Sequence, residues 1–228
     1  MSRNILILSG SPRERGNSHA LAEAFAQGAE AAGVPVEVIR TFALHVEPCR
    51  GCLRCNVLKR CAIKGDDWPK VAEAFRNAGG ILFAAPIFFL HLPGNMKLVL
   101  DRFRSLFHVQ MKAEGAGLEH TPRYDTSRPY GLILVQGARG ERGVREVREL
   151  FAFITEMEGN PREVDALVGN GLGLSGQVRM DADELRRIYE KLGLPAGNAE
   201  KDAAYNRQLM QQARAMGERM AEKVRARA

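Results

Sequence analysis

The sequence predicts an α/β fold in which five parallel strands form a doubly wound sheet. Short apolar runs alternate with segments of helical period along the 228 residues. Strands that alternate with helices form parallel sheets with right-handed crossovers. The length is sufficient for one large α/β domain, and the hydrophobic content of 45% is ordinary for a globular protein.

Five apolar runs are predicted as strands. They lie at residues 4–8, 36–40, 80–85, 130–136 and 162–169. Residues 5–8 are all apolar, which is typical of a strand buried on both faces of a parallel sheet. Pro86 ends the third run.

The helical segments follow these strands in turn. Ser18 is a suitable N-cap, and Leu21, Phe25 and Gly28 recur at helical spacing before Gly33 ends the segment. Further helices are expected at about 68–77, 94–107, 141–158, 182–192 and 201–225.

Two departures from a minimal α/β domain are also expected. Residues 109–128 are polar and show no clear period, so they are predicted to form an insertion. Residues 1–180 would form the α/β domain, including a cysteine loop at 46–67. Residues 181–228 would form a helical C-terminal extension.

Charge and hydropathy narrow the class of protein. The net charge of +6 suits an anionic ligand or a nucleic acid, but the basic residues are spread along the chain, so a solvated surface without nucleic acid is favoured. No apolar run approaches the ~20 residues that span a bilayer, and the first apolar run is too short for a signal peptide. We expect a cytoplasmic protein with no membrane partner.

All four cysteines lie close together, with the spacing C-x2-C-x2-C-x5-C. They are Cys49, Cys52, Cys55 and Cys61. In a reducing compartment such a group is more often a metal site or a set of redox thiols than disulfides. From the spacing alone, a 4Fe–4S cluster, a four-thiolate zinc site and metal-free redox thiols all stay open. Basic residues in the same stretch would offset a cluster's negative charge; they are Arg50, Arg54, Lys59, Arg60 and Lys64.

The loop after the first strand is predicted to bind a phosphate. It contains hydroxyl, amide and basic side chains at Ser9, Ser11, Arg13, Asn17 and Ser18, and it leads into a helix whose first N–H groups are free. The loop lacks both the Gly-Lys-Ser/Thr ending of a P-loop and a G-x-G-x-x-G sequence, which favours a monophosphate. Ligands of such sheets bind at the carboxyl ends of the strands, where loops 86–95 and 136–142 also lie.

Two motifs resemble the flavodoxin-like NAD(P)H-dependent FMN reductase family. Residues 9–18 read SGSPRERGNS, and residues 85–97 with Leu100-Asp-Arg102 resemble the segment that lines the flavin ring. Ala85 and Phe88 stand where that family commonly has a hydroxyl residue and a tyrosine. The resemblance implies a flavodoxin-like sheet of order 2-1-3-4-5. It also implies that FMN has its phosphate on the first loop and its ring beside Pro86, Ile87, Phe88, Phe89, Gln136 and Gly137.

The cysteine spacing is similar to that of the iron–sulfur flavoproteins within this family. This implies that the four cysteines bind a 4Fe–4S cluster beside FMN, in a homodimer or homotetramer. The expected function is electron transfer between a reduced donor, NAD(P)H or ferredoxin, and an acceptor. No catalytic acid or base is required, because FMN supplies the chemistry. The rival hypotheses are an NAD(P)H-dependent FMN or quinone reductase whose cysteines bind no metal, and a zinc-bearing nucleic-acid-binding module.

Overall fold

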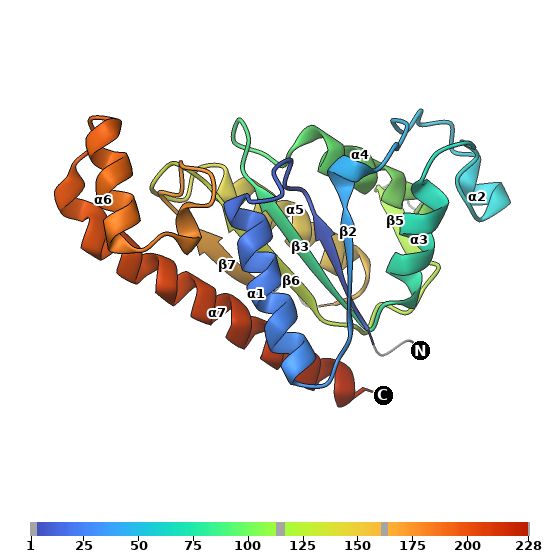
Figure 1. Cartoon of the computed structure of the whole chain (residues 1–228). Helices are drawn as coiled ribbons and strands as arrows, with labels where there is room; N and C mark the ends of the chain where they lie inside the picture. Colours follow the sequence, from blue (N-terminus) through green and yellow to red (C-terminus); the bar gives the residue numbers. More distant parts are fainter. Residues whose placement is uncertain (1–3, 113–116, 161–163, 228) are drawn as a thin grey trace.

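The protein is built on a five-stranded parallel sheet of order β2-β1-β3-β6-β7 (Figure 1). The computed structural model describes residues 4–112, 117–160 and 164–227. The strands are β1 Ile5–Ser9, β2 Val36–Arg40, β3 Gly80–Pro86, β6 Tyr130–Val135 and β7 Asp165–Gly169. Since β6 and β7 are the fourth and fifth strands of this sheet, the predicted order 2-1-3-4-5 is confirmed.

Helices cover both faces of the sheet (Figure 1). One face packs against α1 (Asn17–Ala31) and α7 (Ala199–Arg225), and the other against α3 (Trp68–Asn77), α4 (Gly94–Arg102) and α5 (Val144–Met157). Successive residues of β1 supply the two cores in alternation, as the pleat of a strand requires. Leu6 and Leu8 lie in the core under α3 to α5, and Ile5 and Ile7 in the core under α1 and α7.

The last helix lies directly against the first. A Cβ atom added to Gly28 of α1 would stand 2.0 Å from the carbonyl oxygen of Arg214, and one added to Gly217 of α7 would stand 2.0 Å from that of Phe25. The two helices therefore touch backbone to backbone, which only glycine allows. Between them in sequence lies α6 (Ala182–Lys191). Its N-cap is Asp181, whose carboxylate accepts a hydrogen bond from the N–H of Glu184.

The described part of the segment predicted as an insertion, 109–128, contributes to two antiparallel strands; residues 113–116 lie outside the described residues. The third predicted helix ends early: α4 stops at Arg102, a 3-10 turn follows at Phe103–Leu106, and β4 (Phe107–Met111) pairs antiparallel with β5 (Leu118–Pro122). The residues of β5 are largely exposed, so no alternation of apolar and polar residues marks this strand in the sequence. The beginning of the predicted fifth strand, 162–163, lies outside the described residues.

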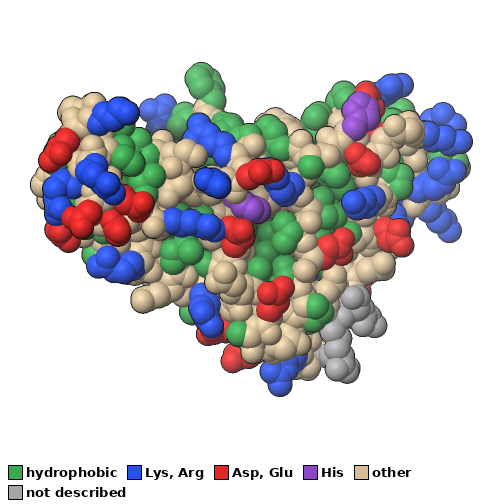
Figure 2. All heavy atoms as spheres, in the orientation of Figure 1, with side chains coloured by type: hydrophobic (Ala, Val, Ile, Leu, Met, Phe, Trp, Pro, Cys, Tyr) green, Lys and Arg blue, Asp and Glu red, His purple; other side chains and the backbone are tan. Residues whose placement is uncertain are grey.

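The first loop, the loop after β3 and the cysteine loop at 46–67, called the cysteine stretch below, lie along one edge of the sheet, at the carboxyl ends of the strands (Figure 1). Lys and Arg side chains collect at the end of the molecule that carries the short helix α2 (Cys55–Leu58), as Figure 2 shows. Among the described residues, no helix combines the length and the apolar character needed to cross a membrane.

Candidate functional site

The first loop is a compact turn at the end of β1. The hydroxyl of Ser11 donates to the carbonyl oxygen of Arg13 at 2.8 Å and accepts from its N–H at 3.3 Å. A Cβ atom on Gly16 would lie 2.5 Å from the Ser11 Oγ, so the turn needs glycine there. α1 then begins at Asn17 with no acidic residue in its first turn. Free N–H groups and the helix dipole make this end of α1 suitable for an anion.

One of the predicted hydroxyls is buried without a partner within the part of the chain that the structure describes. Ser9 is fully buried and its Oγ has no hydrogen-bond partner. Ser18 is also buried. Arg13 is exposed at the rim of the turn. A buried hydroxyl without a partner is costly, and a phosphate at this end of α1 would supply an acceptor. The residues present therefore fit the phosphate of FMN.

The side chain of Asn17, which was predicted to contact the phosphate, makes hydrogen bonds within the protein. Its Nδ2 donates to the carbonyl oxygens of Leu172 (3.2 Å) and Leu174 (2.7 Å), and its Oδ1 accepts from the N–H of Val178 (3.0 Å). These bonds tie the beginning of α1 to the loop after β7. Only the backbone N–H of Asn17 is left for a ligand.

The loop after β3 carries an exposed, strained turn. The N–H of Ile87 donates to the carbonyl oxygen of Val135 at 2.7 Å, which holds the loop to β6. Phe88 and His91 then exchange backbone hydrogen bonds of 2.8 and 3.0 Å around Phe89 and Leu90. Those two residues have φ of 48° and 65°, a region that is unfavourable for large side chains.

The side chains of Phe88 and Phe89 stand at the surface of this loop. Phe88 is 45% exposed and Phe89 wholly exposed, beside Pro86, which is partly buried. Hydrophobic side chains stand out above the sheet edge in Figure 2. This apolar surface lies at the place where the predicted flavin ring would need one, next to the first loop.

The third loop of this edge is held by Gln136. Its Nε2 donates to the carbonyl oxygen of Gly140 at 2.5 Å and to the Oδ1 of Asn170 at 2.7 Å. A Cβ atom on Gly137 would approach the Cα of Gly173 to 3.4 Å. The Gln136 side chain thus supports the loop, while the exposed backbone at Gly137 faces solvent.

The four cysteines line a single pocket. Cys55 is buried, Cys61 is half-buried, and Cys49 and Cys52 are exposed; all four are free thiols. Arg102, Arg104 and Ser105 complete the lining from the region around the end of α4. In type and number, these four thiols are the donors that a 4Fe–4S cluster requires. Within the described residues, no three His, Cys, Asp or Glu side chains are arranged so that they could hold a metal ion.

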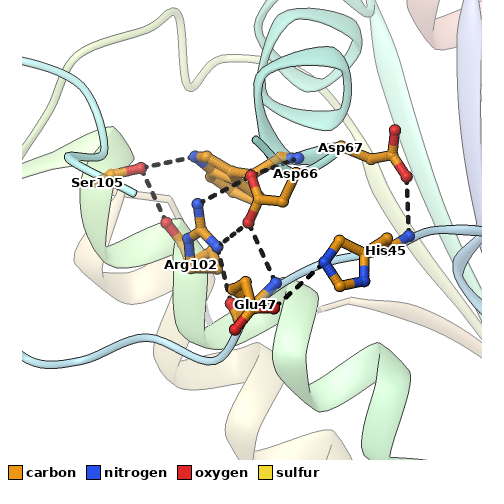
Figure 3. Close-up of polar contacts among 7 residues, drawn as sticks. His45, Glu47, Asp66, Asp67, Arg102 and Ser105 are labelled. Carbon is orange, nitrogen blue, oxygen red and sulfur yellow. Dashed lines mark hydrogen bonds and ion pairs between the residues drawn. The ribbon is translucent and has the colours of Figure 1, made fainter. Parts of the chain in front are cut away.

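A polar network closes the base of the cysteine stretch (Figure 3). Arg102 Nη1 donates to Asp66 Oδ2 at 2.5 Å and to the carbonyl oxygen of Glu47 at 2.7 Å, and the N–H of Glu47 donates to the same carboxylate at 3.1 Å. Next to them, Asp67 Oδ2 accepts from the N–H of His45 at 2.8 Å. The two ends of the stretch are thereby joined over a buried guanidinium.

This network shifts the pKa values of its charged members. Burial would raise the pKa of Asp66, but hydrogen bonds from Arg102, Glu47 and Trp68 outweigh it and hold the pKa below its usual value. Burial would likewise lower the pKa of Arg102, but Asp66 and Cys61 outweigh it and raise the pKa. The Asp66–Arg102 pair is therefore ionised at neutral pH.

The β4–β5 hairpin holds the part of the stretch that contains Cys55. Asn56 Nδ2 donates to the carbonyl oxygen of Val109 at 2.7 Å, and the N–H of Val109 donates back to Asn56 Oδ1 at 3.1 Å. Arg123 donates to the carbonyl oxygens of Cys55 (2.9 Å) and Asn56 (3.2 Å). Arg104 Nη1 stands 3.6 Å from the Cys55 sulfur.

Sequence reasoning missed these supporting residues. Arg102 was associated by resemblance with the flavin segment, but the structure places it beneath the cysteine stretch. Arg104 and Arg123 belong to no motif, and they approach Cys55 from 49 and 68 positions away in sequence. Only the folded hairpin brings them together, so no local pattern could have identified them.

The strand order of the sheet, with the loops of the candidate site at its carboxyl edge, is that of a flavodoxin-like protein. A model of the NADPH-dependent FMN reductase family matches residues 3–158, more than half of the chain, so the chain belongs to this family, as its two motifs predicted. Among solved structures, it is similar to the NAD(P)H:quinone oxidoreductase from Methanothermobacter marburgensis, with a TM-score of 0.64, 15% identity, and coverage of 96% of this chain and 98% of the other. That likeness concerns the fold.

The curated relatives include iron–sulfur flavoproteins. One from Methanocaldococcus jannaschii is 30% identical over 115 residues, which are 49% of this chain and 59% of the relative. One from Methanosarcina thermophila is 32% identical over 95 residues, which are 42% of this chain and 49% of the relative. The chain thus spans only about half of the length of these relatives.

Proposed function

We propose that this protein binds FMN at the carboxyl edge of its sheet and transfers electrons between a reduced donor, NAD(P)H or ferredoxin, and an acceptor. A 4Fe–4S cluster on Cys49, Cys52, Cys55 and Cys61 would take part. The single observation that carries this proposal is that all four thiols line one pocket, in a stretch that leaves the same sheet edge as the phosphate loop (Figure 1).

Each part of the site has its own task. The first loop would bind the phosphate with the hydroxyls of Ser9 and Ser18 and the free N–H groups of α1, and Arg13 would add charge from the rim. The Phe88–Phe89 turn would exclude water from one side of the ring. When bound, FMN exchanges electrons singly or in pairs and an iron–sulfur cluster exchanges them singly. The names of the relatives support the pairing of these two cofactors.

A second candidate is an NAD(P)H-dependent FMN or quinone reductase whose cysteines hold no metal. The family match supports it, because that family is defined by NADPH and FMN without reference to a cluster. Absorption spectra of protein purified without oxygen, together with iron, sulfide and zinc analysis, separate the hypotheses. We expect flavin bands and a broad shoulder that dithionite bleaches. Flavin bands without iron would favour the second candidate, and a colourless protein with stoichiometric zinc would refute both.

The phosphate site is tested by Ser9→Ala. Because the Ser9 hydroxyl has no partner in the described protein, its removal should leave the unfolding free energy unchanged or slightly higher. A hydrogen bond to a charged group contributes about 1.5 kcal/mol or more, so FMN affinity should fall about tenfold. Fluorescence titration of the metal-replete protein with FMN measures this. Ser127→Ala, an exposed site at the opposite edge, is the control, and an unchanged dissociation constant for Ser9→Ala would exclude the assignment.

A further inference from the structure

Three guanidinium groups line the cysteine pocket, those of Arg50, Arg102 and Arg104, and they differ in burial and in how their charge is compensated. Arg102 is fully buried and shares its charge with the carboxylate of Asp66, leaving its Nε–H without a partner beside the pocket. Arg104 is half-buried and forms no ion pair with a carboxylate in the part of the chain that the structure describes. Arg50 is exposed, so water and salt screen its charge. Of the two guanidinium groups that are not exposed, Arg104 is therefore the one whose charge no carboxylate of the described residues compensates.

Arg104 is also held in contact with a thiol. Its Nη1 lies 3.6 Å from the sulfur of Cys55, 3.3 Å from the Oδ1 of Asn56 and 3.4 Å from the carbonyl oxygen of Phe107. The carbonyl oxygen of Arg104 itself lies 3.9 Å from the same sulfur. Contacts on both sides fix the guanidinium against Cys55, the only buried cysteine of the four.

We propose that Arg104 is a positioning residue that raises the reduction potential of the iron–sulfur cluster through the Cys55 sulfur. This inference rests on the proposed function. Reduction adds one electron, and therefore one negative charge, to the group that the thiolates bind. A fixed cation and an N–H donor at the sulfur stabilise the reduced form more than the oxidised form, and a partly buried setting strengthens both effects.

The chain offers a matched control for the effect of net charge. Arg54 belongs to the same stretch and precedes Cys55, but it is exposed and does not line the pocket. Arg54→Gln removes the same charge without removing a donor from the sulfur. Arg104→Lys retains the charge but replaces the planar fork with a single ammonium group, which meets the sulfur and Asn56 less well.

The experiment is an anaerobic redox titration of the cluster-loaded protein with dithionite, followed by EPR and absorbance, alongside iron and sulfide analysis. At a fixed solution potential we expect Arg104→Gln to lower the ratio of reduced to oxidised cluster about tenfold, which corresponds to about 59 mV for one electron. Arg104→Lys should fall between this variant and the unmodified protein, and Arg54→Gln should match the unmodified protein.

The outcomes separate this inference from the proposed function. Unmodified protein without iron refutes the proposed function itself. Loaded Arg104→Gln with an unchanged midpoint, or an equal decrease in Arg54→Gln, refutes only the role of Arg104. If Arg104→Gln binds no iron, Arg104→Lys decides the matter: a lower midpoint supports the inference and an unchanged one overturns it.

Discussion

At the scale of single residues, Asp66 is the centre of the network that closes the cysteine stretch. Its side chain and that of Arg102 are not exposed at all, and its carboxylate also accepts the N–H groups of Glu47 and Trp68. Removing one member of such a buried pair leaves the other charge without compensation, which typically costs about 3 kcal/mol or more.

We therefore predict that Asp66→Asn lowers the free energy of unfolding by about 3 kcal/mol at pH 7. The pKa of Asp66 in the folded protein lies below the ordinary 3.8, so the ionised form contributes stability above that pH and the contribution is lost as pH falls through the folded pKa. The difference between the two proteins should be constant from pH 5 to 7 and shrink below about pH 3.8. Urea unfolding at several pH values measures it.

Asp101→Asn is the control, because this aspartate forms an exposed ion pair with Lys97 and should change stability by less than about 1 kcal/mol. A loss in Asp66→Asn that persists unchanged at pH 3 would contradict the assigned ionisation.

Sequence reasoning identified the phosphate loop from its residue types, but it could not foresee that Asn17 bonds a loop more than 150 positions away. An amide side chain at the start of a helix can either bind a phosphate or hold a neighbouring loop, and only the packing of the loop after β7 decides between these two roles.

At the scale of elements, the β4–β5 hairpin is what positions the short helix α2. Arg123, which follows β5, donates to the carbonyl oxygens of Cys55 and Asn56, the first two residues of α2. The side chain of Asn56 in turn bonds the backbone of β4. An isolated helix of four residues is not stable by itself. The conformation of α2, and with it the place of Cys55, therefore depends on the hairpin.

We predict that Arg123→Met loosens the cysteine stretch without unfolding the sheet. Losing charge-assisted hydrogen bonds that contribute about 1.5 kcal/mol should make local opening about tenfold more frequent. Tryptic cleavage after Arg54 and Lys59 should accelerate by that factor, as measured by mass spectrometry over time. Arg187→Met, on α6, is the control and should leave these rates unchanged. Equal acceleration at sites throughout the chain would show global unfolding and contradict the prediction.

The elements differ in how well the sequence predicts them. β1 was predicted to within a residue because its apolar run is continuous, and α3 because its apolar face and its beginning at Trp68 are both distinct. β5 is missed because none of its residues is buried and Leu118 is its only large apolar residue. Its stability comes from pairing with β4 and from the contacts of the hairpin with α2, and such contacts have no local pattern.

At the scale of the whole molecule, the order of the sheet followed from the alternation of strands and helices together with the family resemblance. The position of α7 could not be predicted in the same way. Sequence position alone suggested that residues 181–228 extend from a finished domain, but α7 covers the sheet face that α1 leaves open. Its buried side chains belong to the same core as those of β1; they are Leu209, Ala213, Met216, Met220, Ala221 and Val224.

We predict that a chain ending at residue 180 does not fold independently. Removing α7 would expose the apolar surface of α1, including Phe25, and the sheet residues beneath it, which leaves one core without its cover. Far-UV circular dichroism and binding of a hydrophobic dye should show a partly unfolded, aggregating protein, whereas native-like spectra with cooperative melting would establish 1–180 as a separate domain.

In the full-length chain, Met216→Ala should lower the free energy of unfolding by about 2 to 5 kcal/mol, as measured by urea unfolding. Met210→Ala, at a partly buried position of the same helix, should cost clearly less, because a side chain that keeps contact with water loses less on truncation.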